Sequence, residues 1–314
     1  MDSRRLDPRL GELHFGISTV ANVEGWTVES DWKPKTILIA TDFSGTSLRV
    51  LAIARQLALH YGVGIKIVHV FTLAAAHRYA VPSGWIIGRL RKRTHLQLQQ
   101  FVRRLIKAGC SVETQVIETS GPPADGILRT IANCDNPLIL LGTHSRDRVE
   151  RFILGSTAEE VVRNTDWPVI TVGPDAKRTS RQGSLNRLMF ATDLTERSFA
   201  AIHLLSGLLL NNLELTVVHV SRPDDAILSA DWMEPLRSRL AEQFGRAAGT
   251  FQLRFENYVA KDCAHKICEV AKEEDSDLLL IGLHPGKQLS AHLSPKTGFQ
   301  IIMGAPCPVL SVRS

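Results

Sequence analysis

The sequence lacks the features that mark membrane and secreted proteins. No apolar run approaches the roughly 20 residues that a membrane-spanning helix needs, and the first residues lack the apolar centre of a secretory signal. The five cysteines are scattered and odd in number, which argues against a disulfide framework and predicts reduced thiols in or near the cores. We therefore expect a cytoplasmic protein with no membrane partner.

Aromatic residues are also scarce, at 6% of the chain. The net charge of +5 and the pI of about 9.0 would suit anionic partners, but the charges are spread along the sequence. The run Arg89 to Arg93 is basic and isolated, so we interpret it as a solvated helix face. The composition therefore predicts no nucleic-acid partner.

Catalytic and metal-binding patterns are missing as well. The chain has no Walker-type G-x-x-x-x-G-K and no evident serine, histidine and acid arrangement. His69 and His219 lie within apolar strands, where a histidine with satisfied hydrogen bonds is the common case. Cys263, His265 and Cys268 supply at most three ligands at a spacing that does not converge on a helix. We predict no catalytic residue and no metal site.

What the sequence does contain is an alternation of strands and helices. Apolar strands are expected at 36–40, 65–70, 111–118, 138–141 and 169–172, with helices at 48–60, 94–107, from 121 and from 155. Pro82-Ser83-Gly84 is expected to interrupt the second helical stretch. The order predicts an α/β fold, a doubly wound parallel sheet covered on both faces with right-handed crossovers.

This pattern occurs twice. The residues 187–195 repeat 36–44, and 278–284 repeat 138–144, with offsets of 151, 150, 140 and 140 for the pairs that match along the chain. A polar stretch separates the two copies. We therefore expect an extension at 1–33, a first domain at 34–174, a linker at 175–186 and a second domain at 187–314.

The segment from 138 to 172 is the most informative. Four apolar residues stop at Gly142, and a helix begins near Ser156, which would form a capping box with Glu159. A helix amino end offers free N–H groups and partial positive charge, which suits a phosphate. The spacing also fits an ordinary capped helix with no ligand.

Gly142-x-x-Ser145, nine residues and then Gly155-Ser156 resemble the G-x-x-G-x(9)-G-S/T loop of the universal stress protein family. Ser145 stands where the family has glycine. The flanking residues agree in both halves, so the resemblance is to tandem members of the family. It implies two five-stranded domains that are Rossmann-like, of the adenine nucleotide alpha hydrolase-like type.

The resemblance also implies a site for ATP or a related adenine nucleotide, with Mg²⁺ as a possible companion. Ala40 and Thr41 would line the purine side, Asp42 would meet the ribose or a divalent ion, and the backbone of Val70 would meet the adenine edge. The loop residues would cradle the phosphates through backbone N–H groups. The full set of implied nucleotide-binding residues is Ala40, Thr41, Asp42, Val70, Leu141, Gly142, Ser145, Gly155, Ser156 and Thr157.

Two readings of this set stay open at the level of sequence. Asp42 could serve only as a cap, since Asp193 repeats it in the second half. In that half Pro285 and Pro295 replace Ser145 and Gly155, which removes N–H donors. Gly286, Lys287, Lys296 and Gly298 could form a displaced anion site there, although a solvated loop is the simpler interpretation. We predict one nucleotide pocket per chain.

The leading functional hypothesis is a stress-responsive regulatory or binding module that uses this nucleotide. A nucleotide-independent interaction scaffold is the alternative, and an enzyme with weak ATP hydrolysis is a third. The last strand of each half, at 169–172 and 309–312, would be exposed at a sheet edge. The resemblance implies that such edges pair, giving a pseudo-dimer within the chain, and that two chains form a homodimer.

Overall fold

The computed structural model of the 314-residue chain describes residues 21–23, 32–72, 83–143, 155–174, 176, 185–195, 213–224, 251–283 and 295–313. The first half contains β2 (Thr36–Ala40), α1 (Gly45–Tyr61), β3 (Gly64–Thr72), α2 (Ser83–Lys107), β4 (Val112–Thr119), α3 (Pro123–Ala132), β5 (Pro137–Gly142), α4 (Ser156–Asn164) and β6 (Val169–Val172). The second half contains β7 (Arg187–Thr192), β8 (Leu213–Ser221), β9 (Phe251–Val259), α7 (Cys263–Glu273), β10 (Leu278–Leu283), α8 (Pro295–Gly304) and β11 (Val309–Arg313). A short strand, β1 (Ala21–Val23), precedes both halves.

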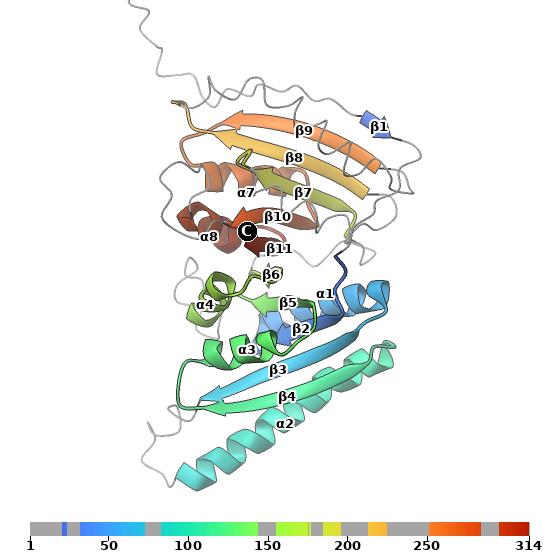
Figure 1. The fold of residues 1–314 in the computed structure, drawn as a ribbon, viewed down its shortest axis with the longest axis vertical. Helices are drawn as coiled ribbons and strands as arrows, with labels where there is room; N and C mark the ends of the chain where they lie inside the picture. Colours follow the sequence, from blue (N-terminus) through green and yellow to red (C-terminus); the bar gives the residue numbers. More distant parts are fainter. Residues whose placement is uncertain are drawn as a thin grey trace, which may run out of the picture.

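The strands form one 11-stranded sheet that runs through both halves (Figure 1). Its order is β1-β9-β8-β7-β10-β11-β6-β5-β2-β3-β4. Within each half all pairs are parallel, and the strand order reverses between the first and the fourth strand of that half. Ligands of open α/β sheets bind at such a reversal, beyond the carboxyl ends of the strands. The expected fold class is therefore confirmed.

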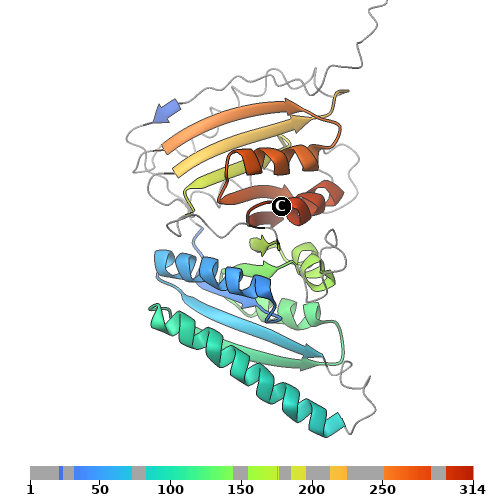
Figure 2. The same ribbon diagram turned by 180° about the vertical axis from the view of Figure 1, so that it is seen from behind.

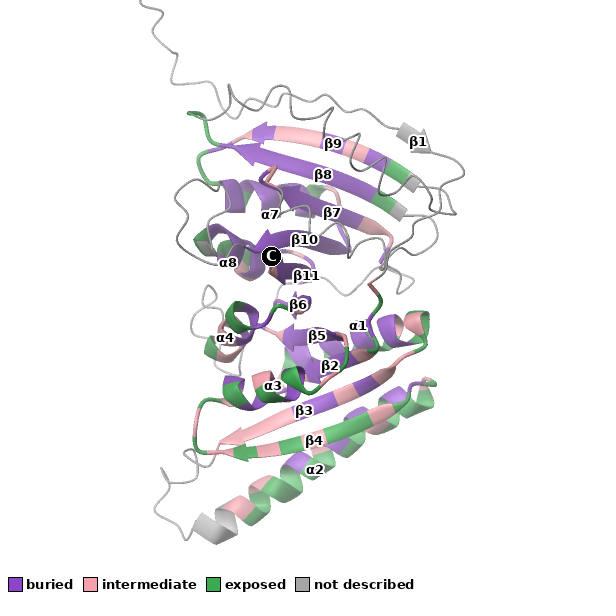
Figure 3. Cartoon of the chain, in the orientation of Figure 1, coloured by how far each residue is buried: buried purple, intermediate pink, exposed green. Residues whose placement is uncertain are grey.

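Each face of the sheet carries one continuous core. One core lies under α1 and α2, and the other lies under α3, α4, α7 and α8 (Figure 2). Strand β10 is buried along its whole length and β5 along all but its last residue, Gly142, as Figure 3 shows. Covering on both faces explains why these strands are runs of apolar residues rather than alternating ones.

The two halves meet through their last strands. β6 pairs antiparallel with β11, with Ile170 opposite Leu310. The Thr171 hydroxyl donates to the Val309 carbonyl oxygen at 3.3 Å, and the Ser311 hydroxyl donates to the Val169 carbonyl oxygen at 3.2 Å. The two donors, Thr171 and Ser311, correspond at the 140-residue offset, and so do the two acceptors, so the interface is pseudo-symmetric. The expected pairing of these two edges within the chain is present.

Three local expectations need correction. Ser83 and Gly84, which were expected to interrupt the second helical stretch, belong to helix α2, whose most periodic part is the predicted 94–107, whereas Pro82 lies outside the described residues. Helix α1 begins at Gly45, three residues before the predicted start, with Ser44 as N-cap but without a capping hydrogen bond from its side chain. Strand β1 of the extension pairs antiparallel with β9, which the sequence did not predict.

The five cysteines are all free thiols, as predicted. Cys110, Cys263 and Cys307 are buried, whereas Cys134 and Cys268 are half-buried against the second core. Burial raises the pKa of the Cys268 thiol to about 12. These cysteines are core residues by position.

Candidate functional site

A cavity of about 320 Å³ opens where the strand order of the first half reverses. Its volume lies near the lower end of the range for small-molecule sites, roughly 300–1,000 Å³. Nine of the ten residues that the sequence predicted line it: Ala40, Thr41, Asp42, Val70, Leu141, Gly142, Gly155, Ser156 and Thr157. The tenth, Ser145, lies outside the described residues. The structure therefore brings together side chains from three strands and one helix amino end.

Six further residues line the cavity that sequence reasoning did not single out: Val68, Thr72, Pro123, Ile127, Thr143 and Ala158. Pro123 and Ile127 belong to α3, which packs against β3 and β4. Their contribution depends on how α3 packs, which no motif in the sequence reports. With Val70 and Leu141 they give the cavity an apolar wall.

The polar corner of the cavity begins with a tight turn after β2. Phe43 adopts a φ of 61°, in the left-handed region that a bulky residue rarely occupies. Its N–H donates to the Thr41 hydroxyl oxygen at 3.0 Å, and the Ser44 N–H donates to Asp42 Oδ1 at 2.8 Å. The Phe43 ring packs against the His69 and Phe101 rings, with centroids 4.5 and 5.4 Å away. The hydrogen bonds of the backbone and the ring contacts of Phe43 thus hold this strained turn in place, and the turn fixes the direction of the Asp42 side chain.

Asp42 therefore has two roles available to its two oxygens. Oδ1 accepts the hydrogen bonds of the turn, including one from the Ser47 hydroxyl at 3.2 Å. Among the described residues, no hydrogen bond reaches Oδ2, and the side chain is exposed to the cavity. The capping interpretation is correct for one oxygen, while the other is available to a ligand.

The second half repeats this turn. Leu194 has a φ of 64°, its N–H donates to the Thr192 hydroxyl at 3.0 Å, and Asp193 Oδ1 accepts from the Thr195 N–H at 3.1 Å. Asp193, however, is only 4% exposed. The turn is thus a property of the fold, whereas an exposed carboxylate belongs to the first half.

His69 and His219 occupy matching positions on the second strand of each half. Nδ1 of His69 lies 2.7 Å from the Thr41 carbonyl oxygen, and Nδ1 of His219 lies 3.0 Å from the Thr192 carbonyl oxygen. Each ring therefore ties its strand to the turn that follows the first strand. The prediction of hydrogen-bonded core histidines is confirmed.

The amino end of α4 forms the opposite side of the cavity. Its N-cap is Gly155, and Ser156 is the first helical residue, so the predicted capping box with Ser156 as the cap is wrong. The Glu159 carboxylate pairs with Arg163 at 2.7 Å, toward the far end of the helix, rather than with the cap. This pairing also turns the negative charge of Glu159 away from the helix amino end.

Three backbone N–H groups at this helix end lack an acceptor within the described residues, those of Ser156, Thr157 and Ala158. The N–H of Gly155 is different, because it donates to the Thr143 carbonyl oxygen at 2.8 Å. The predicted phosphate contact from the Gly155 amide is therefore not available. A Cβ at 155 would lie 3.1 Å from the same carbonyl oxygen, so glycine is needed there for the close approach of two chain segments.

Gly142 is also required by packing. A Cβ at this position would lie 2.7 Å from Thr46 Oγ1, a residue of α1. Its role is to let β5 approach the amino end of α1, where the first strand also ends. Asp42 is the only residue with a charged side chain among those that line the cavity in the described part of the chain. An anionic ligand would therefore depend on the α4 amides and dipole.

The corresponding region of the second half is filled. Leu283 stands where the first half has Thr143, and it packs onto Gly298, which stands where the first half has Ala158. A Cβ at 298 would clash with the Leu283 side chain. Pro295 begins α8 and has no N–H to donate. Gly298 lies inside α8 against the Leu283 side chain, whereas Gly286 and Lys287 lie outside the described residues.

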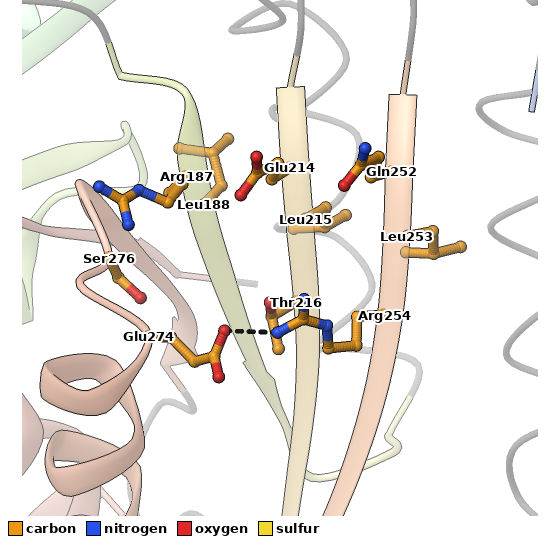
Figure 4. A pocket seen from close by; sticks show the side chains of 10 residues that line it. All are labelled: Arg187, Leu188, Glu214, Leu215, Thr216, Gln252, Leu253, Arg254, Glu274 and Ser276. Carbon is orange, nitrogen blue, oxygen red and sulfur yellow. Dashed lines mark hydrogen bonds and ion pairs between the residues drawn. The ribbon is translucent and has the colours of Figure 1, made fainter. Parts of the chain in front are cut away.

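Figure 4 shows a second, much smaller hollow in the second half, near the amino ends of β7, β8 and β9. Its volume is about 30 Å³, which is room for about one water molecule. Arg254 and Glu274 form an ion pair beside it, with Nη1 and Oε2 2.7 Å apart. It is therefore too small for a ligand.

The described residues contain neither a metal-binding cluster nor a membrane-spanning helix. No group of three or more His, Cys, Asp or Glu side chains is placed to hold a metal ion. No helix in this part of the chain combines the length and the apolar character that crossing a membrane requires.

Comparisons with known proteins agree with the fold and with its duplication. The model of the universal stress protein family matches residues 33–173 and again residues 185–313. A universal stress protein of Methanocaldococcus jannaschii is 28% identical over 140 residues, which is 44% of this chain and 81% of that protein. A universal stress protein of Archaeoglobus fulgidus has a crystal structure that covers 90% of this chain and 99% of its own, with a TM-score of 0.66 and 18% identity. A putative universal stress protein of Pseudomonas aeruginosa, also solved, covers 89% and 93%, with a TM-score of 0.56 and 18% identity.

Proposed function

The chain belongs to the universal stress protein family as a tandem member, and from that premise we propose that its first half binds one adenine nucleotide and acts as a nucleotide-responsive regulatory module. ATP with Mg²⁺ is the proposed ligand. The observation that carries this proposal is the set of three N–H groups at the start of α4, which have no acceptor among the described residues and border a cavity with one apolar wall.

Each part of the cavity suits one part of such a nucleotide. The apolar wall of Val70, Ile127 and Leu141 suits the adenine ring. The exposed Oδ2 of Asp42 suits a ribose hydroxyl or a magnesium ion. The amides of Ser156 and Thr157, with the Ser156 hydroxyl, suit the phosphates. Because Asp42 is the only charged side chain among the described residues that line the cavity, binding rather than turnover is the expected activity.

A proline at position 156 tests the amide contact directly. Gly155 has φ −56° and ψ 130°, the extended conformation that a residue before proline prefers. Proline is also well tolerated as the first helical residue. Ser156→Pro should therefore keep the fold, remove one N–H and the hydroxyl, and weaken ATP binding at least tenfold in titration calorimetry. Ser156→Ala, which removes only the hydroxyl, should weaken binding less.

Thermal unfolding of both variants gives the control for folding. If Ser156→Pro is folded and binds ATP as tightly as the unchanged protein, the α4 amides do not hold the phosphates. If the unchanged protein binds no adenine nucleotide at all, the chain functions without one and the scaffold alternative replaces this proposal.

A further inference from the structure

Helix α2 concentrates the positive charge of the chain. Its 25 residues include seven Lys or Arg and no Asp or Glu: Arg89, Arg91, Lys92, Arg93, Arg103, Arg104 and Lys107. The whole chain has a net charge of +5. Without this helix the remaining sequence would therefore have a net charge of −2, as 5 minus 7.

The two faces of α2 differ sharply in character. Thr94, Leu98, Phe101 and Leu105 are buried toward the sheet. The opposite face is exposed along the outer side of the molecule, beyond β4 (Figures 1 and 3). It carries two basic triplets, which are Arg89, Lys92 and Arg93, and Arg103, Arg104 and Lys107.

The unbroken helix is what aligns these triplets. In the sequence nine residues separate the run at 89–93 from the second triplet, and only the run is evident as a basic segment. In the structure both occur on one helix, on the same side, and at 1.5 Å per residue they are about 21 Å apart. The basic face as a whole, from 89 to 107, is about 27 Å long.

Little of this charge is neutralised by neighbours. Arg91 forms a two-pronged ion pair with Glu118 of β4, at 2.5 and 2.7 Å, but Arg91 does not belong to either triplet. Five members of the triplets have no ion pair among the described residues: Lys92, Arg93, Arg103, Arg104 and Lys107. The face is therefore free to attract an external polyanion.

The shape of the face decides between two polyanions. A bilayer-bound amphipathic helix inserts an apolar side, but the apolar stripe of α2 from Leu98 to Leu105 is buried in its own domain. The outward side has Gln99 and Gln100 between the triplets, and the exposed large apolar residues of the described part of the helix, Leu96 and Ile106, are ten positions apart and form no continuous stripe. A narrow row of cations suits the linear array of phosphates along a nucleic-acid strand better than it suits the flat surface of a membrane. At 3.4 Å per phosphate along a strand, 27 Å corresponds to about eight base pairs.

We propose that the outward face of α2 binds the sugar–phosphate backbone of double-stranded nucleic acid without sequence preference. The contact is made by the two triplets and is independent of the nucleotide cavity. It replaces the expectation, drawn from the dispersed charge of the sequence, that nucleic acid is not a partner. With about four to six phosphates contacted, the logarithm of the affinity should fall against the logarithm of the salt concentration with a slope of about −4 to −5.

Fluorescence anisotropy with a labelled 24-base-pair duplex tests the proposal, at salt concentrations from 50 to 200 mM. The full chain should bind, and Arg103→Gln/Arg104→Gln/Lys107→Gln should bind at least tenfold more weakly with a slope reduced by about 3. Lys261→Gln/Lys272→Gln/Lys296→Gln is the matched control. It removes the same charge from exposed sites of the second half and should retain binding within about twofold.

Three results would overturn the proposal. The first is no binding by the unchanged chain at 50 mM salt, and the second is equal weakening in both triple variants, which would assign the effect to net charge alone. The third is flotation with vesicles of anionic phospholipid but no binding to the duplex, which would assign the face to a membrane surface. Circular dichroism of each variant shows whether it is folded, since all six substitutions are at exposed positions.

Discussion

Single side chains at the turn after β2 determine where the polar corner of the cavity lies. Thr41 accepts the Phe43 N–H and donates to the Ser47 hydroxyl at 3.0 Å, while the His69 ring binds the Thr41 carbonyl oxygen. The left-handed φ of Phe43 costs of order 1–3 kcal/mol. The side chains around it therefore maintain a conformation that the backbone alone would not adopt.

Thr41→Val removes the acceptor for the Phe43 N–H and should destabilise the chain by about 1–3 kcal/mol, as measured by urea denaturation. It should also weaken ATP binding, because Asp42 loses its fixed direction. Thr192→Val is the matched change in the second half, where the Thr192 hydroxyl accepts the Leu194 N–H. It should lower stability by a similar amount and leave ATP binding unchanged. Equal effects of both variants on binding would contradict a specific role for the first turn.

For single residues, the sequence predicted where a residue lies better than it predicted the hydrogen bonds that the residue makes. The repeated Thr-Asp pair located Asp42 at the sheet edge because parallel strands end at a common edge. The division of its two oxygens between turn and cavity depends on hydrogen bonds to Ser44 and Ser47, which only the folded turn creates. Similarly, Gly155 was predicted as an amide donor, yet its N–H is used by Thr143, a residue twelve positions earlier.

Among the elements, the junction of β5 with α1 is the tightest part of the site. Gly142 permits this approach, since a Cβ there would lie 2.7 Å from Thr46 Oγ1 and 3.3 Å from Thr46 Cβ. Helix α1 in turn begins beside the Asp42 turn. The position of β5, which forms one wall of the cavity, therefore depends on residue 142 having no side chain.

Gly142→Ala should destabilise the chain by about 1–3 kcal/mol through overpacking, measured by urea denaturation. Combining it with Thr46→Ala removes the nearer atom of the clash, so the double variant should be more stable than the sum of the two single changes predicts. Additive costs would show that the junction relaxes without strain.

The element pattern of the sequence predicted most strands within one or two residues, because buried parallel strands are apolar runs with clear ends. Helix α2 was the exception. Its first part contains Gly84 and Gly88, which lower helix propensity, and its continuity depends on the core stripe from Thr94 to Leu105. The basic run at 89–93 therefore seemed isolated in the sequence, whereas in the structure it is part of one continuous basic face.

In the described part of the chain, the two halves share a single sheet and two continuous cores, because β6 pairs with β11. These are the edges through which the resemblance implied association. A homodimer of two chains would consequently need a different surface from the one that joins the halves.

A double-mutant cycle at the centre of this junction tests whether the halves share one core. Ile170 and Leu310 are opposite each other in the ladder and are fully buried. Ile170→Ala and Leu310→Ala should each cost about 2–5 kcal/mol. In urea denaturation the double variant should differ from the sum by about 0.5–3 kcal/mol. Agreement with the sum within about 0.5 kcal/mol would mean that the halves are energetically separate.

The hydrogen bond from the Gly155 N–H to the Thr143 carbonyl oxygen has a further consequence. Thr143 and Gly155 are twelve positions apart in the chain, and this bond holds them together at 2.8 Å. The eleven residues from 144 to 154 thus connect two points that are already joined. Lengthening that stretch should cost little in folding, which makes it a suitable place to insert a foreign peptide or reporter near the proposed nucleotide site.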